Sequence, residues 1–153
     1  MCSGEFIASV VDRVAEWDGV EAMSCPDGSI ELRVGGTALG QVSETGVVDL
    51  AFSPEIRDQL LTEGRADRHY AEPRSSWVSV RLRTAEDVRD VLWLLRLAYL
   101  CRVREQTVEG GSSEERGGDL DVDDEFTRLE LSTSLDVLVR QSGEAAEQPT
   151  QTA

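Results

Sequence analysis

The sequence contains no lysine, one histidine and three cysteines, and each shortage argues against a class of protein. All 15 basic residues are arginines, and 30 aspartates and glutamates outnumber them, which gives a formal net charge of −15. A surface this acidic is poorly suited to neutralising nucleic-acid phosphates over a broad area, and anionic membrane surfaces repel it. We therefore expect neither nucleic acid nor a membrane as a partner.

The few metal-binding and disulfide-forming side chains are scattered. Cys2, Cys25 and Cys101 are odd in number and have no C-x-x-C spacing, so they form neither a disulfide framework nor a zinc motif. His69 is alone, and a single histidine cannot build a histidine-rich metal site. The sequence therefore predicts no metal site and no cofactor, and free thiols suit a reducing cytoplasm.

Long hydrophobic runs are also missing. The most apolar stretch, residues 91–101, is shorter than a membrane span and contains Arg96. Glu5 stands where a secretory signal peptide would carry positive charge. We expect a soluble, cytoplasmic protein. Because the acids are spread along the whole chain, we interpret the composition as adaptation to high intracellular salt, where mutual repulsion between carboxylates is screened.

Hydrophobic periodicity predicts the order helix, strands, helix, strand, helix, with one core for one domain. The second helix has a strong start, because Ser53 is a good N-cap and Pro54 suits the first helical position. We expect an α+β fold, with an antiparallel sheet of about four to six strands and helices on one face. The predicted helices cover residues 6–17, 53–63 and 84–99, and the predicted strands cover residues 30–34, 37–43, 47–52 and 77–82.

The composition changes sharply after Arg104. Residues 105–125 hold nine acids and four glycines, which predicts a flexible acidic linker over residues 104–125. Residues 126–141 are apolar enough to dock on the domain, with a strand at Leu129 and Leu131 and a short helix at Leu135 and Leu138. We therefore divide the chain into a domain at 1–103, the linker, the docking segment and a disordered tail at 142–153.

Candidate site residues lie on the polar side of the predicted strands. Asp49 is on the face opposite Val48 and Leu50, and Gln41 and Ser43 share one face of the neighbouring strand. Such a face can line a site, or it can simply be wet, as is common in antiparallel sheets. Both interpretations stay open.

His69 and Trp77 also have two interpretations. His69 lies in a connector, where it is either a surface residue or a general base. Trp77 is either a packing residue or the wall of a ligand site. The hypothesis of a site takes His69 and Asp49 as catalytic residues and takes Gln41, Ser43 and Trp77 as ligand-binding residues.

A string of short segments resembles the small luciferase-domain family. These segments include Ala38-Leu39-Gly40-Gln41-Val42-Ser43, Val48 to Pro54, Gly64 to His69, Ser76 to Val80 and Asp87 to Tyr99. The family is named for fungal luciferases, which oxidise a hydroxylated pyrone with oxygen to give light. The resemblance covers residues 5–103 and implies an α+β domain that acts on, or binds, a small organic molecule.

The chain departs from the family pattern at one motif. Where the family has Gly-His-x-His, this sequence has Gly40-Gln41-Val42-Ser43, and His69 is the histidine that is kept. Glutamine and serine form hydrogen bonds but do not take up a proton near neutral pH. We therefore expect a non-luminescent, small-molecule-binding domain with a degenerate site. The alternatives are an oxidative enzyme acting on a small aromatic substrate, and a protein-interaction module that uses the acidic tail; a homo-oligomer is compatible with each.

A weaker resemblance rests on architecture alone. A helix, a meander, a second helix, Trp77-Val78 and a long helix are similar to the YjbR-type double-wing domain, which is sometimes described as DNA-binding. Architecture does not fix function. The net charge of −15 argues against DNA as a partner.

Overall fold

A computed structural model of the chain describes residues 3–72, 74–110 and 121–145. These residues form one sheet of six strands and five helices. The helices are α1 (Ser3–Val14), α2 (Pro54–Thr62), α3 (Ala85–Gly110), α4 (Val122–Arg128) and α5 (Thr133–Ala145). The strands are β1 (Val20–Ser24), β2 (Ile30–Val34), β3 (Thr37–Val42), β4 (Val47–Ala51), β5 (Asp67–Arg68) and β6 (Trp77–Arg81).

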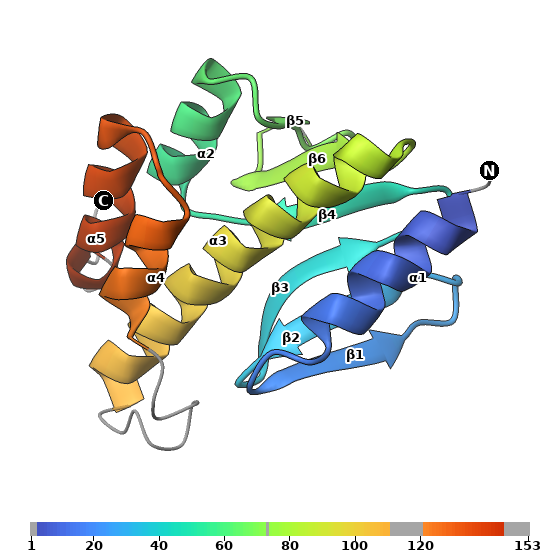
Figure 1. Cartoon of the computed structure of the whole chain (residues 1–153), viewed down its shortest axis with the longest axis horizontal. Coiled ribbons are helices and arrows are strands. Elements are labelled where there is room, and N and C mark those ends of the chain that lie inside the picture. The colour runs from blue at the N-terminus through green and yellow to red at the C-terminus, as the bar shows by residue number, and fades with distance from the viewer. Residues whose placement is uncertain (1–2, 73, 111–120, 146–153) are drawn as a thin grey trace.

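The sheet has the order β1-β2-β3-β4-β6-β5, and all neighbouring strands are antiparallel. Helices α1 and α3 cross the same face of it, while α2, α4 and α5 gather at one end of α3 (Figure 1). This confirms the predicted α+β class, the antiparallel sheet and the order of elements. None of the helices in the described residues is long and apolar enough to span a membrane.

The core lies between the sheet and α3. Val48, Leu50 and Val78 are fully buried there, and they alternate along β4 and β6 with residues that face the other way. Tyr99 of α3 is also buried, and its hydroxyl donates a 2.7 Å hydrogen bond to the Asp18 carbonyl after α1. Such alternation leaves the opposite face of the sheet free for polar side chains.

Four local predictions are corrected by the structure. The first helix ends at Val14 rather than near residue 17, and Cys25 follows a strand, β1, that periodicity did not predict. In the connector before Trp77, two residues form the short strand β5. The expected strand at Leu129 and Leu131 is wrong, because this stretch is the turn between α4 and α5.

The C-terminal helices share the core of the domain. Phe126 of α4 and both Leu135 and Val139 of α5 are buried with the residues of α3. Helix α3 continues to Gly110, beyond the expected domain boundary at 103. Of the predicted acidic linker at 104–125, residues 104–110 belong to α3, residues 122–125 belong to α4, and residues 111–120 lie outside the described residues. Most of the predicted tail, residues 146–153, also lies outside them.

Candidate functional site

A row of polar residues crosses the face of the sheet that α3 leaves uncovered. The pairing register places five residues opposite one another on consecutive strands, from β2 through β3, β4 and β6 to β5. Because residues paired across strands point to the same side, the row shares one face. Its members are Glu31, Gln41, Asp49, Ser79 and Asp67.

Two side chains from this region converge on Asp49 of β4. The Ser79 hydroxyl donates a 2.6 Å hydrogen bond to Asp49 Oδ1. His69 follows β5 directly, and its Nε2 lies 3.6 Å from Asp49 Oδ2. The side chains of His69 and Asp49 are 17% and 22% exposed, so solvent and small molecules can reach both. The separation is too long for a direct hydrogen bond, which leaves both polar atoms able to bind a third group.

The hydrogen bonds of His69 define its tautomer. Its Nδ1 accepts a 2.9 Å hydrogen bond from the backbone N–H of Glu72. In a neutral imidazole the nitrogen that accepts carries no proton, so Nε2 carries it and faces Asp49. This imidazole therefore has no free lone pair with which to remove a proton from a substrate. As arranged, His69 is a hydrogen-bond donor rather than a general base.

Trp77 completes the cluster on β6. Its ring meets the imidazole of His69 edge to face, with centroids 6.2 Å apart. Ser79 is fully buried, and its hydroxyl oxygen also accepts the backbone N–H of Tyr70 at 3.1 Å. The connector after β5 is therefore held against β6, and it holds His69 in place.

The structure does not bring Gln41 and Ser43 to His69. Gln41 is opposite Asp49 in register, but its amide nitrogen donates to the Ser29 hydroxyl at 2.8 Å. The Ser43 hydroxyl accepts the backbone N–H of Val47 at 3.1 Å and contacts Thr45, so it stabilises the turn between β3 and β4. Hydrogen bonds to other residues thus occupy the side chains of both Gln41 and Ser43.

Sequence reasoning missed Ser79 as a site residue. The alternation of β6 places it on the same face as Trp77, and this signal was present in the sequence. What the sequence did not contain was the pairing of β4 with β6, which skips β5 and puts Ser79 beside Asp49.

Two clefts lie between the α2–β5 turn and α3, and the smaller one is also lined by Asp67 and Tyr70. Their volumes are about 480 and 240 Å³, and both are lined by Gly64, Arg65 and Asp90. None of the five predicted site residues lines either cleft. Across the described residues, no group of three or more histidine, cysteine or acidic side chains is placed to hold a metal ion.

The fold and the polar cluster together define a small α+β domain with an antiparallel sheet covered by helices on one face. Residues 36–98, somewhat less than half of the chain, match the family model described as Luciferase domain, and this match supports the luciferase-domain family for this part of the chain. The matched span runs from just before β3 into α3, so it contains Asp49, His69 and Ser79. No curated protein and no solved structure matches the chain.

Proposed function

We propose that the domain binds a small hydroxylated organic molecule on the open face of the sheet, without luminescent turnover. The observation that carries the proposal is the 3.6 Å spacing between His69 Nε2, a donor, and Asp49 Oδ2, an acceptor. A hydroxyl group both accepts and donates one hydrogen bond, so a single ligand hydroxyl can satisfy the two atoms at once. Trp77 offers an aromatic surface beside them for the rest of the ligand.

Binding is favoured over oxidative catalysis by the tautomer of His69. The Nδ1 lone pair is used by the Glu72 N–H, and Gln41 and Ser43, which the resemblance aligns with two histidines of the family motif, carry no imidazole. As arranged, His69 therefore has no free lone pair with which to act as a general base. The alternative of an interaction module depends on the acidic tail, most of which lies outside the described residues.

A thermal-shift screen tests this function. Phenol, catechol and a hydroxylated pyrone would be added separately to the parent protein and to the His69→Ala and Asp49→Asn variants. A ligand at about 100 times its Kd stabilises a folded protein by about 2.7 kcal/mol, which raises the Tm by several degrees. We expect this shift in the parent and its loss in both variants.

Asp58→Asn is the control for removing a carboxylate. Asp58 lies on α2 and pairs with the neighbouring Arg57 at 2.8 Å, away from the cluster. It should keep the full ligand-induced shift. An equal shift in the parent and in both cluster variants would place binding elsewhere, and a hydrogen-peroxide or light signal from the parent would instead favour oxidative turnover.

We also propose a salt-adapted, cytoplasmic protein, on the strength of the net charge of −15 and the free thiols of Cys25 and Cys101. Burial, above all, raises the pKa of the Cys101 thiol to about 12, so this thiol stays protonated and unreactive in the folded state. The burial of Cys101 in α3 is consistent with a packing role for this residue.

Salt dependence of stability follows from the charge. Lowering KCl from about 1 M to about 0.1 M lengthens the Debye length from about 3 to about 10 Å, so that carboxylates repel one another over longer distances. We expect the Tm, measured by circular dichroism, to fall by several degrees over this range. A Tm that stays constant or rises would contradict the salt-adapted assignment.

A further inference from the structure

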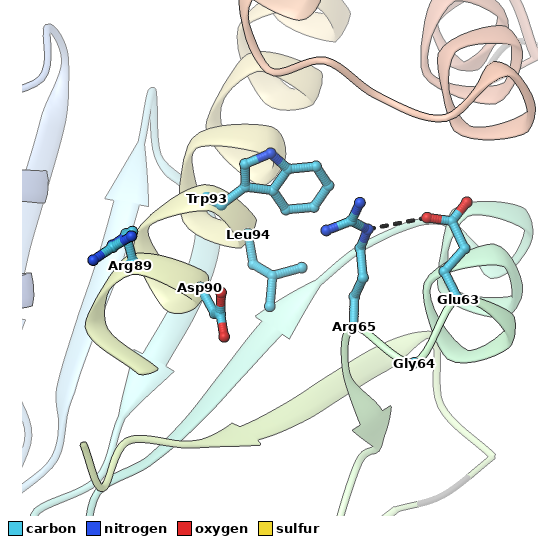
Figure 2. A pocket seen from close by; sticks show the side chains of 7 residues that line it. All are labelled: Glu63, Gly64, Arg65, Arg89, Asp90, Trp93 and Leu94. Carbon is cyan, nitrogen blue, oxygen red and sulfur yellow. Dashed lines mark hydrogen bonds and ion pairs between the residues drawn. The ribbon is translucent and has the colours of Figure 1, made fainter. Parts of the chain in front are cut away.

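The larger cleft has the size and shape of a small-molecule site. Its volume of about 480 Å³ lies in the range of ligand pockets in proteins. It is bounded by the turn after α2 on one side and by α3 on the other, and Figure 2 shows the guanidinium group of Arg65 beside the Trp93 ring. Leu94 gives the cleft an apolar wall, and Asp90 places a carboxylate at its edge.

The guanidinium group of Arg65 is fixed in orientation, but its contacts leave part of its hydrogen-bonding capacity for a ligand. Its Nε donates to Glu63 at 3.0 Å, and its carbon lies 4.2 Å from the centre of the Trp93 ring. Figure 2 shows its terminal nitrogens turned away from Glu63 toward the cleft. Among the described residues, no carboxylate is paired with these nitrogens, and the side chain is 40% exposed.

The turn between α4 and α5 holds both walls of the cleft. The Trp93 indole N–H donates a 3.1 Å hydrogen bond to the Leu129 carbonyl, and the Ser132 hydroxyl donates to Glu63. Desolvation alone would raise the pKa of Glu63, but hydrogen bonds from Ser132, Gln59 and Arg65 outweigh it and lower that pKa. Glu63 therefore stays ionised, and the positions of Arg65 and Trp93 are set before any ligand arrives.

These features select one class of ligand. A guanidinium edge with free nitrogens pairs with a carboxylate in a two-pronged geometry, and the indole of Trp93 beside it offers an aromatic surface to a flat ring. Asp90 disfavours ligands with more than one negative charge, such as phosphate esters, because like charges at short range repel. Arg89, which also lines the cleft, points away from Arg65 (Figure 2).

We propose that the cleft lined by Arg65 and Trp93 is a second binding site, for a small aromatic monocarboxylate, with Arg65 as its anion-binding residue. The C-terminal helices α4 and α5, which follow the matched family span, complete this site by holding Trp93 and Glu63. The proposal is independent of the function proposed for Asp49 and His69, because the two sites share no residue.

The test uses naphthoate as the probe and naphthamide as its uncharged counterpart, in about 1 M KCl to screen long-range repulsion. Binding is measured by isothermal titration calorimetry with the full chain. We expect naphthoate to bind the parent, and naphthamide to bind about tenfold more weakly, because a charge-assisted hydrogen-bonded pair is lost. We expect Arg65→Gln to weaken naphthoate binding by about tenfold or more. The affinity of Arg65→Lys should lie between those of the parent and Arg65→Gln.

Arg33→Gln is a closely matched control. Arg33 of β2 pairs with Glu31 at 3.1 Å and is 39% exposed, so it repeats the sequence spacing, partner and exposure of Arg65 at a place outside the cleft. It should leave the affinity unchanged. Ser132→Ala, checked for folding by circular dichroism, should weaken binding severalfold through the positions of Glu63 and Arg65.

Three results would overturn the proposal: no binding to the parent, unchanged affinity in Arg65→Gln, or an equal loss in Arg33→Gln. Loss of naphthoate binding in His69→Ala with full binding in Arg65→Gln would also overturn it, and would assign the carboxylate to the open face of the sheet. If the Asp49 and His69 variants bind every ligand as the parent does, the function proposed for the open face of the sheet fails. The Arg65 variants alone then decide whether the cleft is a binding site.

Discussion

Replacing Phe126 with alanine is expected to lower the free energy of unfolding by about 3–5 kcal/mol, the usual cost of emptying a buried aromatic site. Phe126 is fully buried in the common core, and the guanidinium carbon of Arg140 lies 5.6 Å from the centre of its ring. The loss should appear as a lower midpoint in urea denaturation, with one cooperative transition. Such a result supports our proposal that residues 126–141 dock as an integral part of the domain.

Val137→Ala is the matched control within the same C-terminal pair of helices. Val137 is 46% exposed on α5, and exposed substitutions usually change stability by no more than about 0.5 kcal/mol. If Phe126→Ala cost no more than Val137→Ala, the C-terminal helices would be a loosely attached extension, and the docking proposal would fail.

Substituting Gly40 with alanine is expected to destabilise the protein by about 3 kcal/mol, at the upper end of what overpacking costs. A Cβ atom at position 40 would collide with the backbone carbonyl oxygen of Asp49 on the neighbouring strand. Because this neighbour is backbone in a central strand, it cannot move aside by a change of rotamer. The substitution should also displace Asp49 and weaken ligand binding at the open face; chemical denaturation and the thermal-shift screen measure the two effects.

Gly36→Ala is the control for Gly40→Ala, because it measures the cost of a strained backbone conformation without a steric clash. Gly36 has a φ of +82°, and no atom beyond its adjacent residues lies within 4 Å of the position that an alanine methyl group would occupy, so alanine there meets only conformational strain. That strain costs about 1–2 kcal/mol. If Gly40→Ala cost less than Gly36→Ala, close approach of β3 and β4 would not be the reason for a glycine at position 40.

The strands that face the core were predictable, and the exposed edge was not. In β4 and β6, buried and polar residues alternate, so periodicity found both. In β1 four of the five residues are exposed, because the strand pairs only with β2 and contributes little to the core. Nothing in its hydrophobic pattern distinguishes it from a loop.

Leu129 and Leu131 show a second limit of periodicity. Their alternation is typical of a strand, yet they form a turn in which Glu130 has a φ of 56°. The Leu129 carbonyl is held by the indole N–H of Trp93, a residue 36 positions earlier in the chain. A contact at this sequence separation has no local signature, so the turn could not be predicted from residues 126–141 alone.

The candidate site was partly predictable for the same physical reason. Alternation placed Asp49 on the polar face, and His69 and Trp77 were singled out as chemistry-bearing residues in the sequence. Their convergence depends on the pairing of β5 with β6 and of β6 with β4, which is set by the whole sheet. The tautomer of His69 depends on one backbone N–H, and no pattern of side chains reports it.

The most direct test of the proposed function uses the fact that the chain has a single histidine. With isotope-labelled histidine, the imidazole of His69 gives one set of NMR signals. On titration with catechol and then with a hydroxylated pyrone, we expect these signals to move in a saturable way in the parent and to stay still in Asp49→Asn. If a ligand binds, as measured by calorimetry, while the His69 signals of the parent remain unmoved, the open face of the sheet is not the binding site.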